Sequence, residues 1–431
     1  MLKELKLTHF KNFHQATLGL GPFTLLVGAN ASGKSNLRDA FRFLHGISRG
    51  YSLAEIMGEK WGEGGVLQWR GIRGGVRETA FQGSNIFALE VNFEIDDDGR
   101  TRDAEYRIAV MVGKNGKPPR VDLERLIVGG ECVFDSHPEK DRPEQPDINQ
   151  LTVTVRTEAQ SGFAAAYSTY PRSRPLLSQI AEQHDAHHSS VRELTRAALD
   201  AFSPARFFDL HPEAMRLPSI PGQTVVGDRG ENLSSSIQAI CADSHQKAVL
   251  LEWLRALTPM DVIDFEFPAD AAGRILLTLV EPSGGVKSAK RKVSALSASD
   301  GTLRFLAMMA ALLGPQPARL YFFEEIENGI HPTRLSLLLD LIERQVSSSR
   351  IQVVASTHSP QLLALLSEQS RRHASVIYRL DDTPGARIRR IADIPEVGEV
   401  LKKQNWGRLH ESGWLENVVA FADADSEEAQ V

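Results

Sequence analysis

Cysteine is scarce in this chain, and its scarcity excludes several classes of protein. Only two cysteines, Cys132 and Cys241, occur among 431 residues. Neither belongs to a Cys-x-x-Cys pattern or a Cys/His cluster, so the sequence indicates neither a disulfide framework nor a zinc site. We therefore expect a reducing, cytoplasmic setting.

Long hydrophobic runs are also lacking. The longest apolar stretches, such as residues 306–313, are far shorter than the roughly 20 residues that span a bilayer. The first ten residues, MLKELKLTHF, alternate like a strand and contain no signal-peptide core. We expect no association with a membrane. Sustained heptads are missing too, which argues against a long coiled coil.

Positive charge is not in excess, because the formal net charge is −6 at pH 7. This net charge excludes a protein that coats nucleic acid with a uniformly basic surface, although it is compatible with a local basic groove. Two basic clusters, within Lys287–Lys292 and Arg387–Arg390, are interpreted as solvated hairpins, with a nucleic-acid contact as the alternative. The stretch HDAHH at 184–188 lacks further partners at ligand spacing and is interpreted as an exposed helix junction, not a metal site.

The length predicts two domains, or one large domain with an insertion. Residues 2–9 and 23–28 are predicted strands, and three alternating runs joined by DDDG and GKNGK predict an antiparallel sheet. We predict an N-terminal lobe over 1–156, a mainly helical insertion over 157–231 and a C-terminal α/β lobe over 232–431. The fold class is therefore α/β.

The stretch GANASGKS at 28–35 carries the clearest chemistry. It satisfies G-x-x-x-x-G-K-[ST], lies between an apolar strand and a predicted helix, and so indicates a loop that binds a nucleoside triphosphate. Gly28 and Gly33 let the backbone wrap a phosphate. Lys34 supplies a compact positive charge, and the hydroxyl of Ser35 is a ligand for Mg²⁺.

Two later strands each end in polar residues. RLYFFEEIENGIHP ends an apolar strand with Glu324, suited to the Mg²⁺ shell, and Glu325, suited to act as a general base on water. IQVVASTHSP ends a second strand with His358, whose imidazole is suited to bond a γ-phosphate. Taken alone, the two glutamates equally fit a strand end that exposes acidic residues to solvent, and His358 fits better a structural histidine whose hydrogen bonds are satisfied.

A third stretch, VSALSASDGTLRFLAMMAALL, predicts a helix with Ser299 as its N-cap and with Asp300 and Gly301 in its first turn. A helix start with a serine hydroxyl and a glycine is a second anion site. Because the loop at 28–35 already serves one nucleotide, this second site suggests a nucleotide held by another chain. Simple capping without a ligand is the alternative.

In this order, GxxxxGKS, LSASDGT, FFEEIENGIHP and ASTHSP resemble the motifs of ABC-type ATPases of the SMC, RecF and OLD group. The resemblance is strongest to stand-alone, AAA_21-type predicted ATPases related to RecF and to the ATPase half of OLD nucleases. It covers about residues 1–45 and 293–365. It implies an ABC-type P-loop ATPase head, with a mixed sheet lobe, a mainly parallel sheet lobe and a helical insertion.

The resemblance also implies the roles of individual residues. Walker A and its flank would bind ATP through Gly28, Asn30, Gly33, Lys34, Ser35 and Asn36. Ser299 and Gly301 would belong to the signature motif, and His358 would be the switch histidine. Ser35 and Glu324 would hold Mg²⁺, and Glu325 would be catalytic. The family implies a homodimer, or a higher oligomer, that sandwiches ATP.

Some positions depart from the family pattern. Walker B has Glu324-Glu325 where Asp-Glu is frequent, and the signature has Asp300 where transporters have glycine. The segment after ASTHSP is too short for a Toprim nuclease domain, so we expect any nuclease or effector to be a separate polypeptide, as in split antiphage defence systems. DNA is a possible partner. The alternatives are an ATP-bound scaffold that sequesters a toxic effector, and a RecF-like repair clamp.

Overall fold

The computed structural model describes most of the chain, in ten stretches: residues 1–113, 116–136, 148–159, 162–183, 189–258, 260–282, 290–349, 351–359, 361–380 and 384–394. HDAHH and Lys287 lie outside the described residues. Two compact units are present. The first is Met1–Ala205 with the described residues after Arg371, and the second is Arg206–Arg371.

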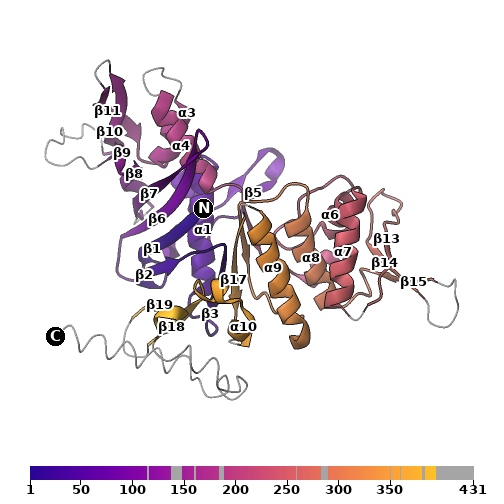
Figure 1. The fold of residues 1–431 in the computed structure, drawn as a ribbon. Coiled ribbons are helices and arrows are strands. Elements are labelled where there is room, and N and C mark those ends of the chain that lie inside the picture. The colour runs from indigo at the N-terminus through magenta and orange to yellow at the C-terminus, as the bar shows by residue number, and fades with distance from the viewer. Residues whose placement is uncertain are drawn as a thin grey trace. The chain divides into compact units, whose positions relative to one another are not determined.

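The first unit is built on an eight-stranded sheet in the order β11-β10-β9-β8-β7-β6-β1-β2, in which all the described pairings are antiparallel. Figure 1 shows β6 to β11 as successive neighbours. The predicted antiparallel sheet is thus confirmed. Its strands are β1 (Leu2–Phe10), β2 (Phe13–Gly19), β6 (Ile86–Asp97), β7 (Arg100–Met111), β8 (Arg120–Val128), β9 (Glu131–Asp135), β10 (Gln150–Ala159) and β11 (Gly162–Pro171).

A second group of strands in this unit carries the glycine-rich turn. β18 pairs in parallel with β3 and antiparallel with β19. The group and the other short strands are β3 (Phe23–Val27), β18 (Ser375–Arg379), β19 (Ala386–Arg390), β4 (Lys60–Trp61) and β5 (Leu67–Trp69). The helices are α1 (Lys34–Ser48), α2 (Leu53–Met57), α3 (Leu176–Glu182) and α4 (Ser189–Ala201).

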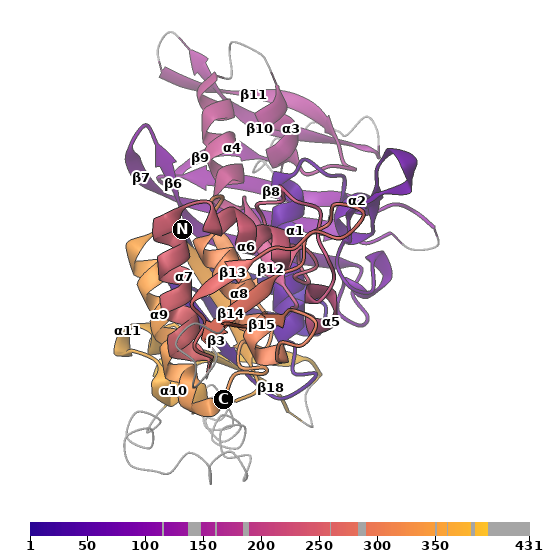
Figure 2. The same cartoon turned by 90° about the vertical axis from the view of Figure 1, so that its right-hand side faces the viewer.

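The second unit places helices beside a short parallel sheet and a small antiparallel one. Figures 1 and 2 both show α7, α8 and α9 side by side. The strands are β12 (Ala205–Phe208), β16 (Leu320–Phe323) and β17 (Gln352–Thr357), then β13 (Asp264–Glu266), β14 (Thr278–Pro282) and β15 (Lys290–Ser294). The helices are α5 (Pro212–Met215), α6 (Leu233–Cys241), α7 (Ser244–Leu257), α8 (Asp300–Leu313), α9 (Leu335–Ser348), α10 (Gln361–Leu365) and α11 (Glu368–Arg371).

The α/β class is as predicted, but the two units divide the chain differently from the three predicted segments. β10 and β11 pair over their whole lengths, from Gln150↔Pro171 to Ala159↔Gly162, and this hairpin crosses the predicted boundary at 156/157. The helices α3 and α4 contact β8, β6 and β10 and belong to the first unit. The pairing of β10 with β11, which sequence patterns do not reveal, keeps both strands in the first unit. None of the described helices is long and apolar enough to cross a membrane.

A buried carboxylate joins β8 to α3 in the first unit. Glu124 is fully buried and accepts hydrogen bonds from the main-chain N–H groups of Leu176 and Leu177, at 2.6 and 2.8 Å, and from the Tyr106 hydroxyl at 2.9 Å. Burial disfavours the charged form and raises the pKa of Glu124 from 4.5 to about 7, although the hydrogen bonds oppose this shift.

This shift predicts a pH dependence of stability. Because the folded pKa of Glu124 lies above its unfolded value, the folded state holds a proton that the unfolded state has released between pH 4.5 and about 7. We expect the free energy of unfolding to fall by about 3 kcal/mol as pH rises through this window, and to level off above it. Urea unfolding should show this slope in the wild type and a shallower slope in Glu124→Gln. Equal slopes in both proteins would contradict this account of Glu124.

Candidate functional site

The glycine-rich turn joins the buried strand β3 to α1, as the sequence predicts. Gly33 is the N-cap of α1 with φ of 127°, a conformation that favours glycine. A Cβ on Gly28 would lie 2.3 Å from the main-chain oxygen of Ile377 on β18. The turn therefore needs Gly33 for its backbone angle and Gly28 for the close approach of another strand.

Lys34 folds back over the turn. It is the first residue of α1, is 5% exposed, and donates through Nζ to the main-chain oxygens of Gly28 and Ala29 at 2.5 and 2.8 Å. In the described structure no side chain caps α1 at this end. A helix start without a side-chain cap, next to a lysine, is the arrangement that binds phosphate. Asn30 is exposed in the turn, and Ser35 is partly buried.

Asn12, in the turn between β1 and β2, supports this loop, and sequence analysis did not identify it. Its Nδ2 donates to the main-chain oxygen of Ser32 at 3.1 Å, and its Oδ1 accepts from Asn36 at 2.7 Å. Lys11 pairs with Asp39 of α1 at 3.6 Å, and burial lowers the pKa of Lys11. These contacts tie α1 and the phosphate loop to the edge of the large sheet. An asparagine in a tight turn is so common that it gave no signal.

The residues predicted to hydrolyse the nucleotide lie together in the second unit. Glu324 and Glu325 follow β16, His358 follows β17, and the parallel register Phe323↔Ala355 puts both strand ends at one edge. The Oε1 of Glu325 lies 2.9 Å from Nε2 of His358. The side chain of Asn328 donates a hydrogen bond to Oε2 of Glu325. Glu325 has φ of 49°, in the left-handed region. The structure thus pairs the predicted base with the predicted switch histidine.

The carboxylate of Glu324 fits Mg²⁺. Its Oε1 is buried at this edge. Carboxylate oxygens are hard ligands, and Mg²⁺ binds through one or two of them together with water and substrate phosphates. The described residues include no group of three or more His, Cys, Asp or Glu that could hold a metal by themselves. Ser35, the other predicted ligand, belongs to the first unit.

Ser299 is the N-cap of α8, as predicted. Its Oγ accepts the Thr302 N–H at 3.2 Å, and α8 begins at Asp300. Arg216, just after α5, donates to Oδ1 of Asp300 at 2.6 Å and to the main-chain oxygen of Ala298 at 3.1 Å. Arg216 was not identified from the sequence, because the pair spans 84 positions. It fixes the chain on both sides of Ser299.

Gly301 packs directly on Gly329, in the loop that follows the Walker B strand. A Cβ on Gly301 would lie 1.9 Å from the main-chain oxygen of Gly329. Beside this contact is a pocket of about 390 Å³ whose lining includes several hydroxyl-bearing side chains. Its lining includes Thr258, Ser299, Thr302, His331, Thr333 and Arg334. The start of α8 therefore faces an open, hydroxyl-rich space large enough for part of a nucleotide.

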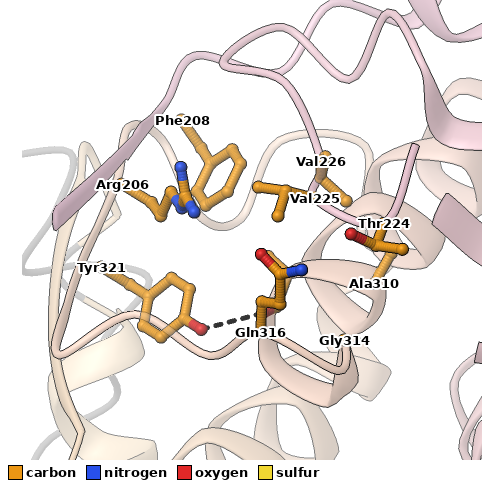
Figure 3. A pocket seen from close by; sticks show the side chains of 10 residues that line it. Arg206, Phe208, Thr224, Val225, Val226, Ala310, Gly314, Gln316 and Tyr321 are labelled. Atoms are coloured by element: carbon orange, nitrogen blue, oxygen red, sulfur yellow. Dashed lines mark hydrogen bonds between the residues drawn. The ribbon is translucent and has the colours of Figure 1, made fainter. Parts of the chain in front are cut away.

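A second cavity in the same unit is unsuited to a ligand. Figure 3 shows it beside Phe208, Val225 and Tyr321, near Gly314 at the C-terminal end of α8. Its volume is about 10 Å³, close to the minimum for one water molecule. The Tyr321 hydroxyl is already used, since it accepts from the Ala318 N–H and donates to the Ala311 carbonyl. We interpret this void as a packing defect in the core.

Comparison with known proteins identifies relatives over most of the chain. Residues 23–127 and 246–364 match the AAA_21 family, described as an AAA domain, putative AbiEii toxin, of a type IV TA system. The chain is 31% identical over 383 residues to a protein of Helicobacter pylori named ATP/GTP phosphatase, and the alignment covers 86% of this chain and 89% of that protein. The AAA_21-type ATPase predicted from the sequence is confirmed by these matches.

Solved structures of SMC heads are also similar to the chain. A head bound to the C-winged helix domain of ScpA aligns with a TM-score of 0.49 at 15% identity, over 91% of this chain and 98% of that one. The SMC head domain of Thermotoga maritima aligns with a TM-score of 0.39 at 12% identity, over 90% and 98%.

The contact between Gly301 and Gly329 predicts the effect of one added methyl group. In Gly301→Ala the methyl group must displace the Gly329 main chain, and we expect a loss of about 1–3 kcal/mol in the free energy of unfolding. The neighbouring change Asp300→Ala removes the ion pair with Arg216, whose Asp300 side chain is exposed, and should cost at most about 1 kcal/mol. Urea unfolding of both variants measures the difference. A more stable Gly301→Ala protein, as helix propensity alone would give, would contradict the close contact.

Proposed function

Because the chain belongs to the AAA_21 family and is an ATPase of that kind, we propose that two copies close around ATP and that hydrolysis reopens them. We propose further that this cycle controls a separately encoded effector, in the manner of a split antiphage defence system acting on DNA. A cytoplasmic setting is part of the proposal and rests on the scarcity of cysteine.

One observation carries the proposal of a dimer. The described residues include one phosphate loop, in the first unit, and, in the second, the capped start of α8 with its adjoining pocket. Both are suited to bind phosphate, yet a single nucleotide needs only one phosphate loop. A two-fold axis would let each helix start complete the loop of the other chain, giving two equivalent composite sites.

The residues of such a site have distinct tasks. Lys34 and the N–H groups at the start of α1 bind the β- and γ-phosphates. Ser35 and Glu324 are the residues that would hold Mg²⁺, and the ion would neutralise part of the phosphate charge. Glu325 takes the proton of the attacking water, and His358 holds Glu325 and would bond the γ-phosphate. Ser299 donates its hydroxyl to the partner's nucleotide.

The family description favours a second candidate function. It names a putative toxin of a type IV TA system, so the chain itself is then a toxic ATPase that another protein antagonises. The two candidates differ in which protein harms the cell. Expression of this chain alone should be harmless if the effector is separate, and should arrest growth in a Lys34-dependent manner if the chain is the toxin.

Glu325→Gln should separate binding from hydrolysis. The amide keeps the shape of the side chain but takes no proton, so we expect ATP binding to persist and turnover to fall about 100-fold or more. Lys34→Ala should weaken nucleotide binding itself. Phosphate release and fluorescent-nucleotide titration, with ATP and with GTP, measure the two effects. Unchanged turnover of Glu325→Gln would remove Glu325 from the mechanism.

Mixing two inactive variants tests the shared site. Lys34→Ala disables the phosphate loop, and Ser299→Arg blocks the helix start. In a mixed dimer both changes fall in one composite site and leave the other intact, so partial ATPase activity should return. Each variant alone should remain inactive. No recovery, in samples where mixed dimers are shown to form by tagged pull-down, would contradict sharing between independently active sites.

A further inference from the structure

A third carboxylate lies beside the hydrolysis residues and has no part in the mechanism described above. Glu327 follows Glu325 by two positions, in the loop after β16. Its Oε1 accepts the main-chain N–H of His358 at 2.8 Å. That bond reaches across 31 positions, from one strand end to the next.

The N–H of His358 needs such a partner. His358 is the first residue beyond β17, so its main chain has left the sheet ladder, and a partly buried N–H without an acceptor is costly. A carboxylate is a stronger acceptor than a neutral carbonyl. Glu327 therefore holds the backbone of His358 at a fixed place relative to the loop that carries Glu325.

The same two strand ends are joined at two further points. The N–H of Glu325 donates to Oγ of Ser356 at 3.2 Å, and the N–H of Ile326 donates to the main-chain oxygen of Ser356 at 3.1 Å. These bonds fix the residue two positions before His358. The bond to Glu327 acts on the main chain of His358 itself, from which the imidazole extends.

We propose that Glu327 is a positioning residue for hydrolysis: it holds the His358 main chain so that the imidazole Nε2 meets Glu325, without itself touching the nucleotide. This inference rests on the proposed roles of Glu325 and His358. This function depends on Oε1 as a hydrogen-bond acceptor, because Oε2 accepts no hydrogen bond from the described residues. The inference thus predicts that an amide, which retains one acceptor oxygen, can replace the carboxylate.

The experiment compares Glu327→Ala with Glu327→Gln. We expect Glu327→Ala to lower kcat by about tenfold to a hundredfold, while KM for ATP and the affinity for nucleotide stay unchanged. Glu327→Gln should keep most of the wild-type kcat. Since Glu327 acts through His358, the double variant Glu327→Ala/His358→Ala should be no slower than His358→Ala alone.

A matched control is available in the same unit. Glu343 on α9 also accepts a loop N–H, that of Ser367, at 3.1 Å. Glu343→Ala removes the same kind of bond outside the hydrolysis cluster and should leave kcat unchanged. An equal loss of kcat in Glu343→Ala would show that losing any carboxylate bond to a loop N–H lowers kcat by destabilising the fold. That result would overturn the proposal.

Amide hydrogen exchange separates this inference from the proposed function. In Glu327→Ala, a peptide that contains His358 should exchange faster, and in Glu327→Gln it should exchange at the wild-type rate, whether or not the protein hydrolyses ATP. Unchanged exchange in Glu327→Ala overturns the role of Glu327. If exchange changes but His358→Ala retains full turnover, the proposed function of His358 fails, and with it the catalytic consequence of the Glu327 bond.

Discussion

The parallel pairing of β16 with β17 is the constraint on which the contact between Glu325 and His358 depends. Both strands are completely buried, so their register is fixed by the core, and a slip by one residue would turn every side chain to the opposite face. With Phe323 opposite Ala355, both strands end at the same edge of the sheet, and β17 extends two residues beyond this pair, to Thr357. Oε1 of Glu325 and Nε2 of His358 can then lie 2.9 Å apart, although 33 positions separate the two residues in the sequence.

The motifs of this chain were predictable because each is local. The turn at 28–35 needs only a strand, two glycines and a helix, and the Ser299 cap needs only the hydroxyl and the first turn of α8. Their residue types are almost dictated by backbone geometry, so the printed sequence reveals them. The alternating strands of the large sheet were predictable for the same reason, since period-two burial is a local pattern.

The supporting residues were not predictable, because each acts across a long stretch of sequence. Asn12 supports a loop 20 positions away, Arg216 holds a helix start 84 positions away, and Glu327 bonds a main chain 31 positions away. Nothing in the local pattern distinguishes such an asparagine, arginine or glutamate from its solvated counterparts. The predicted boundary at 156/157 divides the pairing of β10 with β11, which the sequence pattern did not reveal.

The backbone of Glu325 has a consequence for how this protein tolerates change. A glutamate with φ of 49° occupies a conformation that glycine and asparagine adopt more readily, so the fold retains a residue that is locally unfavourable by about 1–3 kcal/mol. Substitution by glycine would relieve the turn and abolish the carboxylate together. Under the role that we propose for Glu325, glycine at this position would favour folding and end turnover, so this turn sets stability against hydrolysis.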